Sequence, residues 1–175
     1  PRSMRDHWMG EYVTRFRNVV PDDPYRYALY RIMGRFDVTK KFPTPLVLST
    51  ENWLWLQLCL ISETPAGDSH APALQSYTLQ DLANKLEKYG EAHFDPKGHR
   101  PLHYFQLLLL VGRFENAVAF LCSRPAYQVD AVHFAIALTY YGLLRVSSAA
   151  QAPSLDLISV SNHVSYIDLA KLLRR

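Results

Sequence analysis

The chain has 175 residues, of which 49% are apolar and 13% aromatic, and its formal net charge is +3. This composition is typical of a folded domain and excludes an intrinsically disordered chain. The small charge, without a long basic run, excludes a strong nucleic-acid-binding footprint. No apolar run approaches the ~20 residues of a membrane span. Cys59 and Cys122 lie in apolar stretches and are expected to be free thiols, a disulfide between them being the alternative.

Local signals near the N-terminus predict two helices. Apolar residues recur at helical spacing over about residues 4–20. After a Pro-Asp-Asp-Pro break, Asp23 is expected to cap the second helix, with Pro24 in its first turn. This helix is expected to carry Tyr27, Tyr30 or Arg31, and Gly34 along one side and to end near residues 34–37.

The next two helices are separated by a loop. Ser49 or Thr50 is expected to cap a helix that is apolar on most of its circumference and therefore buried on more than one side. Residues 64–75 carry Pro, Gly and small polar residues and are predicted to form a surface loop. Thr78 and Asp81 then resemble a capping box, with Asp standing in for the usual Glu.

Residues 101–121 predict a helical hairpin, the unit of an α-solenoid. Gly112 can adopt a positive φ and end the first helix without a steric penalty. Phe114 is expected to cover the turn, and Ala117 to let the second helix approach the first closely. Such hairpins usually present surfaces to other proteins.

The last third is also expected to be helical. A helix over about residues 128–146 is predicted to bury a periodic face made of Val132, Ala135, Ile136, Leu138 and Thr139. Residues 147–160 are expected to form a loop, with the segment 154–160 a loop or helix start rather than a strand. Ser161 or Asn162 is expected to cap a final amphipathic helix. That helix is predicted to stack on the next solenoid helix rather than lie on a membrane.

The best candidate for a metal site consists of His93, Asp95, His99 and His103. His99 and His103 are four residues apart, a spacing that binds metal when both lie on one helix face. Pro101 falls between them, however, and no further ligand is defined by spacing. The sequence therefore predicts a polar connector with exposed imidazoles, and neither a metal nor a cofactor.

No motif predicts catalysis, since phosphate-loop, nucleophile-elbow, H-E-x-x-H and C-x-x-C patterns are absent from the sequence. His133 is expected to be a hydrogen-bonded core or groove histidine rather than a base. Asp130 is expected at the N-terminus of the same helix, where its charge is favourable. Trp53 and Trp55 are interpreted as core packing, with a partner-facing aromatic hot spot as the alternative.

One stretch of the second helix is rich in tyrosine and arginine. It is interpreted as a solvated helix face, and the alternative is a basic aromatic patch for nucleic acid. Its members are Tyr25, Arg26, Tyr27, Tyr30, Arg31 and Arg35.

About seven or eight helices without a fixed repeat predict an all-α fold, an irregular α-helical solenoid of stacked antiparallel helices. Five blocks, in order, then resemble the nucleoporin-interacting-component family, the linker nucleoporin of the nuclear pore inner ring. The blocks are YALYRIMGRFDV (27–38), ENWLWLQL (51–58), YGEAHF (89–94), PLHYFQLLLLVGRFENAVAFL (101–121) and DAVHFAIAL (130–138).

The resemblance implies a scaffold role in the nuclear pore complex at the nuclear envelope, without enzymatic activity, in support of protein and mRNA transport. It implies an ancestral coatomer-like solenoid that binds other inner-ring nucleoporins, including a linear segment of a membrane-associated nucleoporin, and no nucleic acid directly. Residues 1–175 are expected to be a single solenoid segment of a longer scaffold protein. The alternative is a helical adaptor that binds peptide segments outside the pore. No residue is assigned to a protein contact, since family membership does not locate a site.

Overall fold

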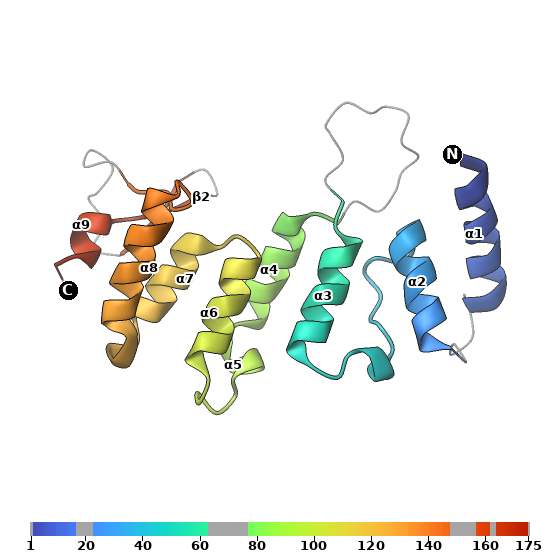
Figure 1. Cartoon of the computed structure of the whole chain (residues 1–175), viewed down its shortest axis with the longest axis horizontal. Helices are drawn as coiled ribbons and strands as arrows, with labels where there is room; N and C mark the ends of the chain where they lie inside the picture. Colours follow the sequence, from blue (N-terminus) through green and yellow to red (C-terminus); the bar gives the residue numbers. More distant parts are fainter. Residues whose placement is uncertain (1, 17–22, 63–76, 148–156, 162–163, 175) are drawn as a thin grey trace. The chain divides into compact units, whose positions relative to one another are not determined.

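The computed structural model describes residues 2–16, 23–62, 77–147, 157–161 and 164–174 (Figure 1). The described part of the chain is mostly helical and divides into two compact units, Pro1–Leu82 and Ala83–Arg175. Both cysteines are free, as expected, and Cys122 is buried. Among the described residues, no helix is both long enough and apolar enough to cross a bilayer.

The first unit contains three α-helices, one 3-10 turn and the start of a fourth α-helix. These elements are α1 (Arg2–Phe16), α2 (Pro24–Gly34), η1 (Thr44–Leu46), α3 (Thr50–Leu60) and α4 (Leu79–Tyr89). The Asp23 side chain accepts hydrogen bonds from the backbone N–H groups of Tyr25 and Arg26, so the predicted cap of α2 is confirmed. Ser49 caps α3 through the N–H group of Asn52.

An aromatic cluster joins α1 to α2 and to the residues that follow α2. The ring centroid of Tyr12 lies 5.9 Å from that of Tyr27 and 5.0 Å from that of Phe36. Tyr27, Arg31 and Gly34, which the sequence places on one side of α2, are all buried. A Cβ atom at Gly34 would collide with the Phe36 ring, so this position requires glycine.

The capping box of α4 is confirmed. The N–H and hydroxyl groups of Thr78 donate to the Asp81 carboxylate at 2.9 and 2.7 Å, and the N–H group of Asp81 donates to the Thr78 hydroxyl at 3.2 Å. The predicted loop at residues 64–75 lies outside the described residues.

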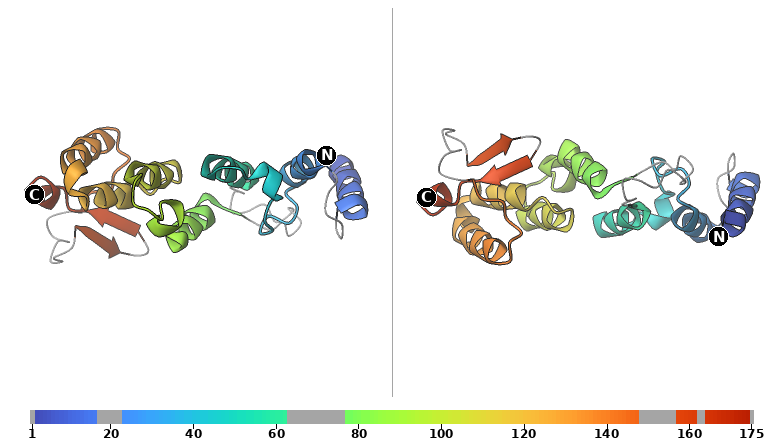
Figure 2. Two further views of the ribbon diagram at one scale, coloured as in Figure 1. Left: turned by 90° about the horizontal axis from the view of Figure 1, so that it is seen from below. Right: turned by 90° about the horizontal axis from the view of Figure 1, so that it is seen from above.

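The second unit continues with further helices and one β-hairpin. After α4 come α5 (Glu91–Phe94), α6 (Pro101–Leu110), α7 (Phe114–Cys122), η2 (Pro125–Tyr127), α8 (Gln128–Tyr140), β1 (Ile158–Ser161), β2 (Val164–Ile167) and α9 (Leu169–Leu172). Figure 2 shows α7 between α8 on one side and the β-hairpin on the other. The predicted hairpin of α6 and α7 is confirmed: Gly112 has φ = 76° and Ala117 is fully buried.

The β-hairpin corrects the prediction of a loop or helix start over residues 154–160. Strands β1 and β2 pair antiparallel, with Ile158 opposite Ile167, and Ile167 is fully buried. The final helix was also placed too early, because α9 begins at Leu169 and its cap is Asp168. Strand pairing and contact with α7 favour the extended backbone here, and neither is visible in a local helical pattern.

Helix α8 is shorter than predicted, and of its predicted face Ala135 is buried, Val132, Leu138 and Thr139 are half-buried and Ile136 is exposed. It ends at Tyr140, and Gly142 follows with φ = 68°. Its buried residues are Ala131 and Ala135, whereas Ile136 is 51% exposed. Ile136 was therefore wrongly placed on the buried face. Both sides of this helix are apolar, so periodicity alone did not distinguish them.

Candidate interaction surface

Of the four candidate metal ligands, Asp95 and His93 make contacts within the protein, the His99 side chain is exposed and that of His103 is half-buried. The Asp95 carboxylate is buried and accepts hydrogen bonds from the backbone N–H groups of His99, at 3.1 Å, and Arg100. The His93 ring stacks on Tyr89 with centroids 4.7 Å apart. Within the described ranges, no three His, Cys, Asp or Glu side chains are grouped to hold a metal ion. Asp95 therefore organises the connector before α6.

Three other expectations concern His133, Asp130 and the tryptophans Trp53 and Trp55. His133 is exposed on α8, so the prediction that it is a core histidine is wrong. Asp130 lies in the first turn of α8, as predicted. Trp53 is half-buried, in keeping with core packing, but Trp55 is 62% exposed and does not belong to the core.

The tyrosines and arginines of α2 do not form one surface patch. Tyr25 is exposed, whereas Tyr27 and Arg31 are buried and point into the first unit. The predicted solvated face therefore includes only part of this set. A continuous basic aromatic patch is absent from these described residues.

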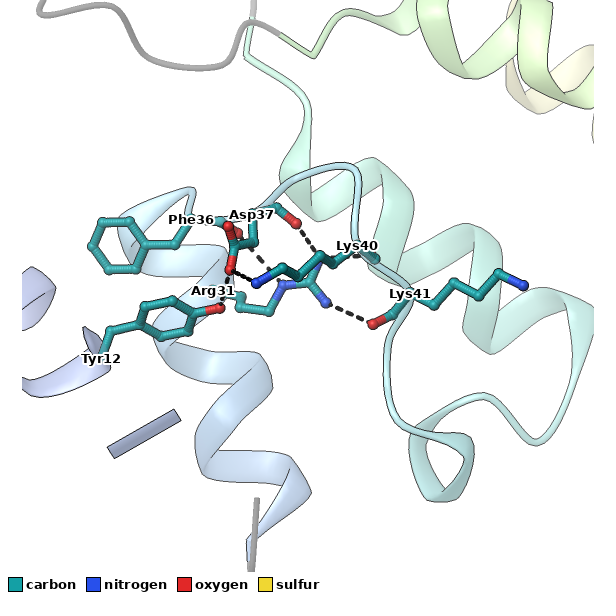
Figure 3. A network of polar contacts seen from close by, with 6 residues as sticks. All are labelled: Tyr12, Arg31, Phe36, Asp37, Lys40 and Lys41. Atoms are coloured by element: carbon teal, nitrogen blue, oxygen red, sulfur yellow. Dashed lines mark hydrogen bonds and ion pairs between the residues drawn. The ribbon is translucent and has the colours of Figure 1, made fainter. Parts of the chain in front are cut away.

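Arg31 is fully buried and organises the loop after α2 (Figure 3). Its Nη2 atom donates to the carbonyl oxygens of Asp37 at 2.6 Å and Lys40 at 2.8 Å, and Nη1 donates to that of Lys41 at 3.2 Å. Nε donates to the carbonyl of Phe36 at 3.4 Å. These acceptors satisfy a charge that would otherwise be costly to bury.

Asp37 connects this loop to α1. Its carboxylate accepts hydrogen bonds from Lys40 at 2.6 Å and from the Tyr12 hydroxyl at 2.8 Å. Burial acts to raise the pKa of Asp37, but these two hydrogen bonds outweigh burial and lower the pKa below its ordinary value. Burial raises the pKa of Tyr12 strongly, with hydrogen bonding to Tyr27 and Asp37 acting in the same direction. The loop and the two helices therefore form one ordered support.

A hollow lies between α1 and α2 and is named here the α1–α2 groove. Its volume is about 200 Å³, and it is lined by Trp8, Arg26, Leu29, Tyr30 and Met33. Leu29 is 55% exposed and Met33 is 50% exposed, one helical turn apart on α2. Exposed apolar side chains that line a hollow are characteristic of sites for other molecules.

One wall of the α1–α2 groove is polar. The Tyr30 hydroxyl donates a hydrogen bond to Glu11, and the Arg26 guanidinium lies 5.8 Å from the Tyr30 ring centroid. The hydrogen bond from Tyr30 lowers the pKa of Glu11 against a smaller opposing effect of burial, and Arg15 lowers it further. The groove therefore suits an apolar side chain with a carboxylate or carbonyl next to it, which Arg26 can bind.

Sequence reasoning missed this groove because it requires two helices to meet. The usable signal was the pair Leu29 and Met33, four residues apart and off the predicted buried side of α2.

The Nup93/Nic96 family matches residues 1–175, the whole chain. The chain belongs to the Nup93/Nic96 family. The resemblance found in the sequence blocks is thereby confirmed.

Members of the Nup93/Nic96 family from distant organisms are similar to this chain. Nucleoporin NIC96 of Chaetomium thermophilum is 39% identical over 180 residues, covering 98% of this chain and 16% of the relative. Nuclear pore complex protein Nup93 of Xenopus tropicalis is 36% identical over 159 residues, covering 87% of this chain and 19% of the relative. The chain thus spans less than a fifth of the length of these two relatives.

A solved structure confirms the fold class. The crystal structure of Chaetomium thermophilum Nic96 SOL matches with a TM-score of 0.83 and 38% identity, over 99% of this chain and 25% of that one. The all-α solenoid fold expected from the sequence is therefore confirmed, and the paired strands β1 and β2 are a small part of the described chain.

Proposed function

We propose that this chain is a structural scaffold component of the nuclear pore complex inner ring. It binds other nucleoporins at the nuclear envelope and supports nucleocytoplasmic transport. The observation that carries this proposal is the match of the whole chain to the Nup93/Nic96 family. Its relatives are named as nucleoporins and nuclear pore complex proteins. The role is that of a scaffold and not of an enzyme.

The 175 residues act as one solenoid segment of a longer scaffold protein. Supporting this, the Nup93/Nic96 relatives named above are five or more times longer than the stretch they share with the chain, which is 16% and 19% of their length.

Within this scaffold, the α1–α2 groove receives a linear segment of another nucleoporin. Family resemblance favours a membrane-associated nucleoporin of the inner ring as its source. The hollow of about 200 Å³ fits one large apolar side chain, held between Leu29 and Met33. Arg26 on the polar wall provides a charged hydrogen-bond donor for the backbone or an acidic residue of the segment.

The binding half of the proposal is tested with fluorescently labelled peptides that tile the linear regions of the inner-ring nucleoporins. One peptide is expected to bind the wild-type chain and to lose affinity by about 30-fold or more on Leu29→Glu or Met33→Glu, as at an interface hot spot. Thr39→Glu, an exposed change in the same unit, is the matched control. Binding that survives both groove variants would remove the groove from this role.

The cellular half is tested by localisation of the tagged full-length protein. A punctate nuclear rim is expected of a pore scaffold. A diffuse cytoplasmic signal would instead support a peptide-binding adaptor outside the pore.

A further inference from the structure

Helix α8 has two opposite apolar faces, and the larger side chains lie on the outside. The buried face carries the small residues Ala131 and Ala135. The opposite face carries Val129, Ile136 and Tyr140, which are 69%, 51% and 82% exposed. A helix that is apolar all round is normally covered on more than one side.

The exposed residues form a regular seam. Val129, His133, Ile136 and Tyr140 are separated by four, three and four residues, so they lie on one stripe, named here the outer face of α8. His133 is exposed in this stripe. This spacing is the one by which a helix packs its side chains against another helix. None of the four side chains carries a fixed charge.

Within the second unit, α8 lies at the edge of the helical stack. Figure 2 shows α7 between α8 and the β-hairpin, so the hairpin covers the far side of α7. The described residues of this unit leave the outer face of α8 open to solvent, as the exposure of Tyr140 shows.

The size of this face indicates what covers it. A helix of 13 residues is about 20 Å long, and one such face offers less than the ~800 Å² per partner of a stable interface between independent proteins. A helix of the same polypeptide needs less area than this, because its packing is intramolecular and does not pay the full cost of bringing two independent molecules together. The matching Nic96 SOL chain is four times as long as the part that corresponds to this chain, which covers 25% of it.

We therefore propose that the outer face of α8 is an internal contact of the longer scaffold protein. A helix from a part of the same polypeptide outside these 175 residues packs along Val129, His133, Ile136 and Tyr140. This rests on the proposal that the chain is a segment of a longer protein. The covering helix presents an uncharged apolar stripe, with small residues opposite Tyr140.

Hydroxyl-radical footprinting of the monomeric full-length protein tests this. Oxidation of Tyr140, measured by mass spectrometry, is compared in the native protein and in the same protein unfolded in urea. We expect several-fold slower oxidation in the native monomer. Rates that are equal in the two states would overturn the proposal.

Two variants of the full-length protein provide a second measurement. Ile136→Glu is expected to lower the melting temperature by several degrees, whereas Gln106→Glu, a change at an exposed position of α6, leaves it unchanged. Protection of Tyr140 that appears only in a dimer, or only after another nucleoporin is added, would contradict an internal contact. Nuclear-rim localisation and peptide binding test the proposed function separately from this contact. A failure of the proposed function would therefore not be mistaken for the absence of a helix packed on the outer face of α8.

Discussion

The guanidinium carbon of Arg31 lies 4.1 Å from the ring centroid of Phe42, so a buried cation rests on an aromatic face. The same guanidinium donates hydrogen bonds to four backbone carbonyls of the loop that leads to Phe42. The ring and the carbonyls together replace the water that a charged group loses on burial. One side chain of α2 thereby determines the path of the chain towards η1.

Replacing Arg31 with methionine is expected to destabilise the first unit by about 3 kcal/mol, since buried carbonyl oxygens lose their donors. Urea unfolding followed by circular dichroism measures this free energy. Arg26→Met, at an exposed position of the same helix, is the control and should change stability by about 0.5 kcal/mol or less. Equal effects of the two changes would contradict the role given to Arg31.

Lowering the pH is expected to weaken the hydrogen bond that the Tyr12 hydroxyl of α1 donates to Asp37. The pKa of Asp37 is lower in the folded state than its ordinary value of 3.8. Its contribution to stability is therefore complete above about pH 3.8 and is lost as the pH falls through the lower, folded-state pKa. Urea midpoints at pH 6 and pH 3 should differ less for Asp37→Asn than for the wild type. If both proteins showed the same pH dependence, Asp37 would be excluded as a cause of the loss of stability in acid.

Gly112→Val is expected to destabilise the hairpin of α6 and α7 by more than about 1 kcal/mol. The reason is backbone strain alone, because φ is 76° and a Cβ atom would meet no atom within 4 Å. Thermal unfolding measures the effect. Gly10→Ala, in the interior of α1 and also with open space around it, should instead stabilise the chain slightly.

Ala117→Leu is expected to cost about 1–3 kcal/mol, because it overpacks a fully buried position on α7. The same substitution at exposed Ala92 of α5 should be close to neutral. An unchanged melting temperature for Ala117→Leu would mean that α7 is not tightly packed on its buried side.

Helix starts and ends could be predicted because their causes are local. Asp23, Ser49 and the pair Thr78 and Asp81 each bond to backbone groups within three residues. Gly112 ends α6 through its own backbone conformation. Such interactions are encoded in short stretches of sequence and require no knowledge of the neighbouring helices.

The β-hairpin and the α1–α2 groove could not be predicted in this way. Ile158 pairs with Ile167 of the neighbouring strand, and that pairing competes with a plausible helical pattern for the same residues. The groove requires Trp8 of α1 to lie beside Leu29 and Met33 of α2. The spacing of apolar residues within one helix does not predict which other helix packs against it.

The sequence by itself determined the helical class, the caps and, through five ordered blocks, the Nup93/Nic96 family. Only the tertiary structure decided that Arg31 is buried, that Ile136 and Tyr140 are exposed, and that the Asp95 carboxylate accepts hydrogen bonds from the loop before α6. The physical reason is the sequence separation over which each interaction acts. Capping and periodicity act over three or four residues, whereas burial depends on which distant segment packs against each face.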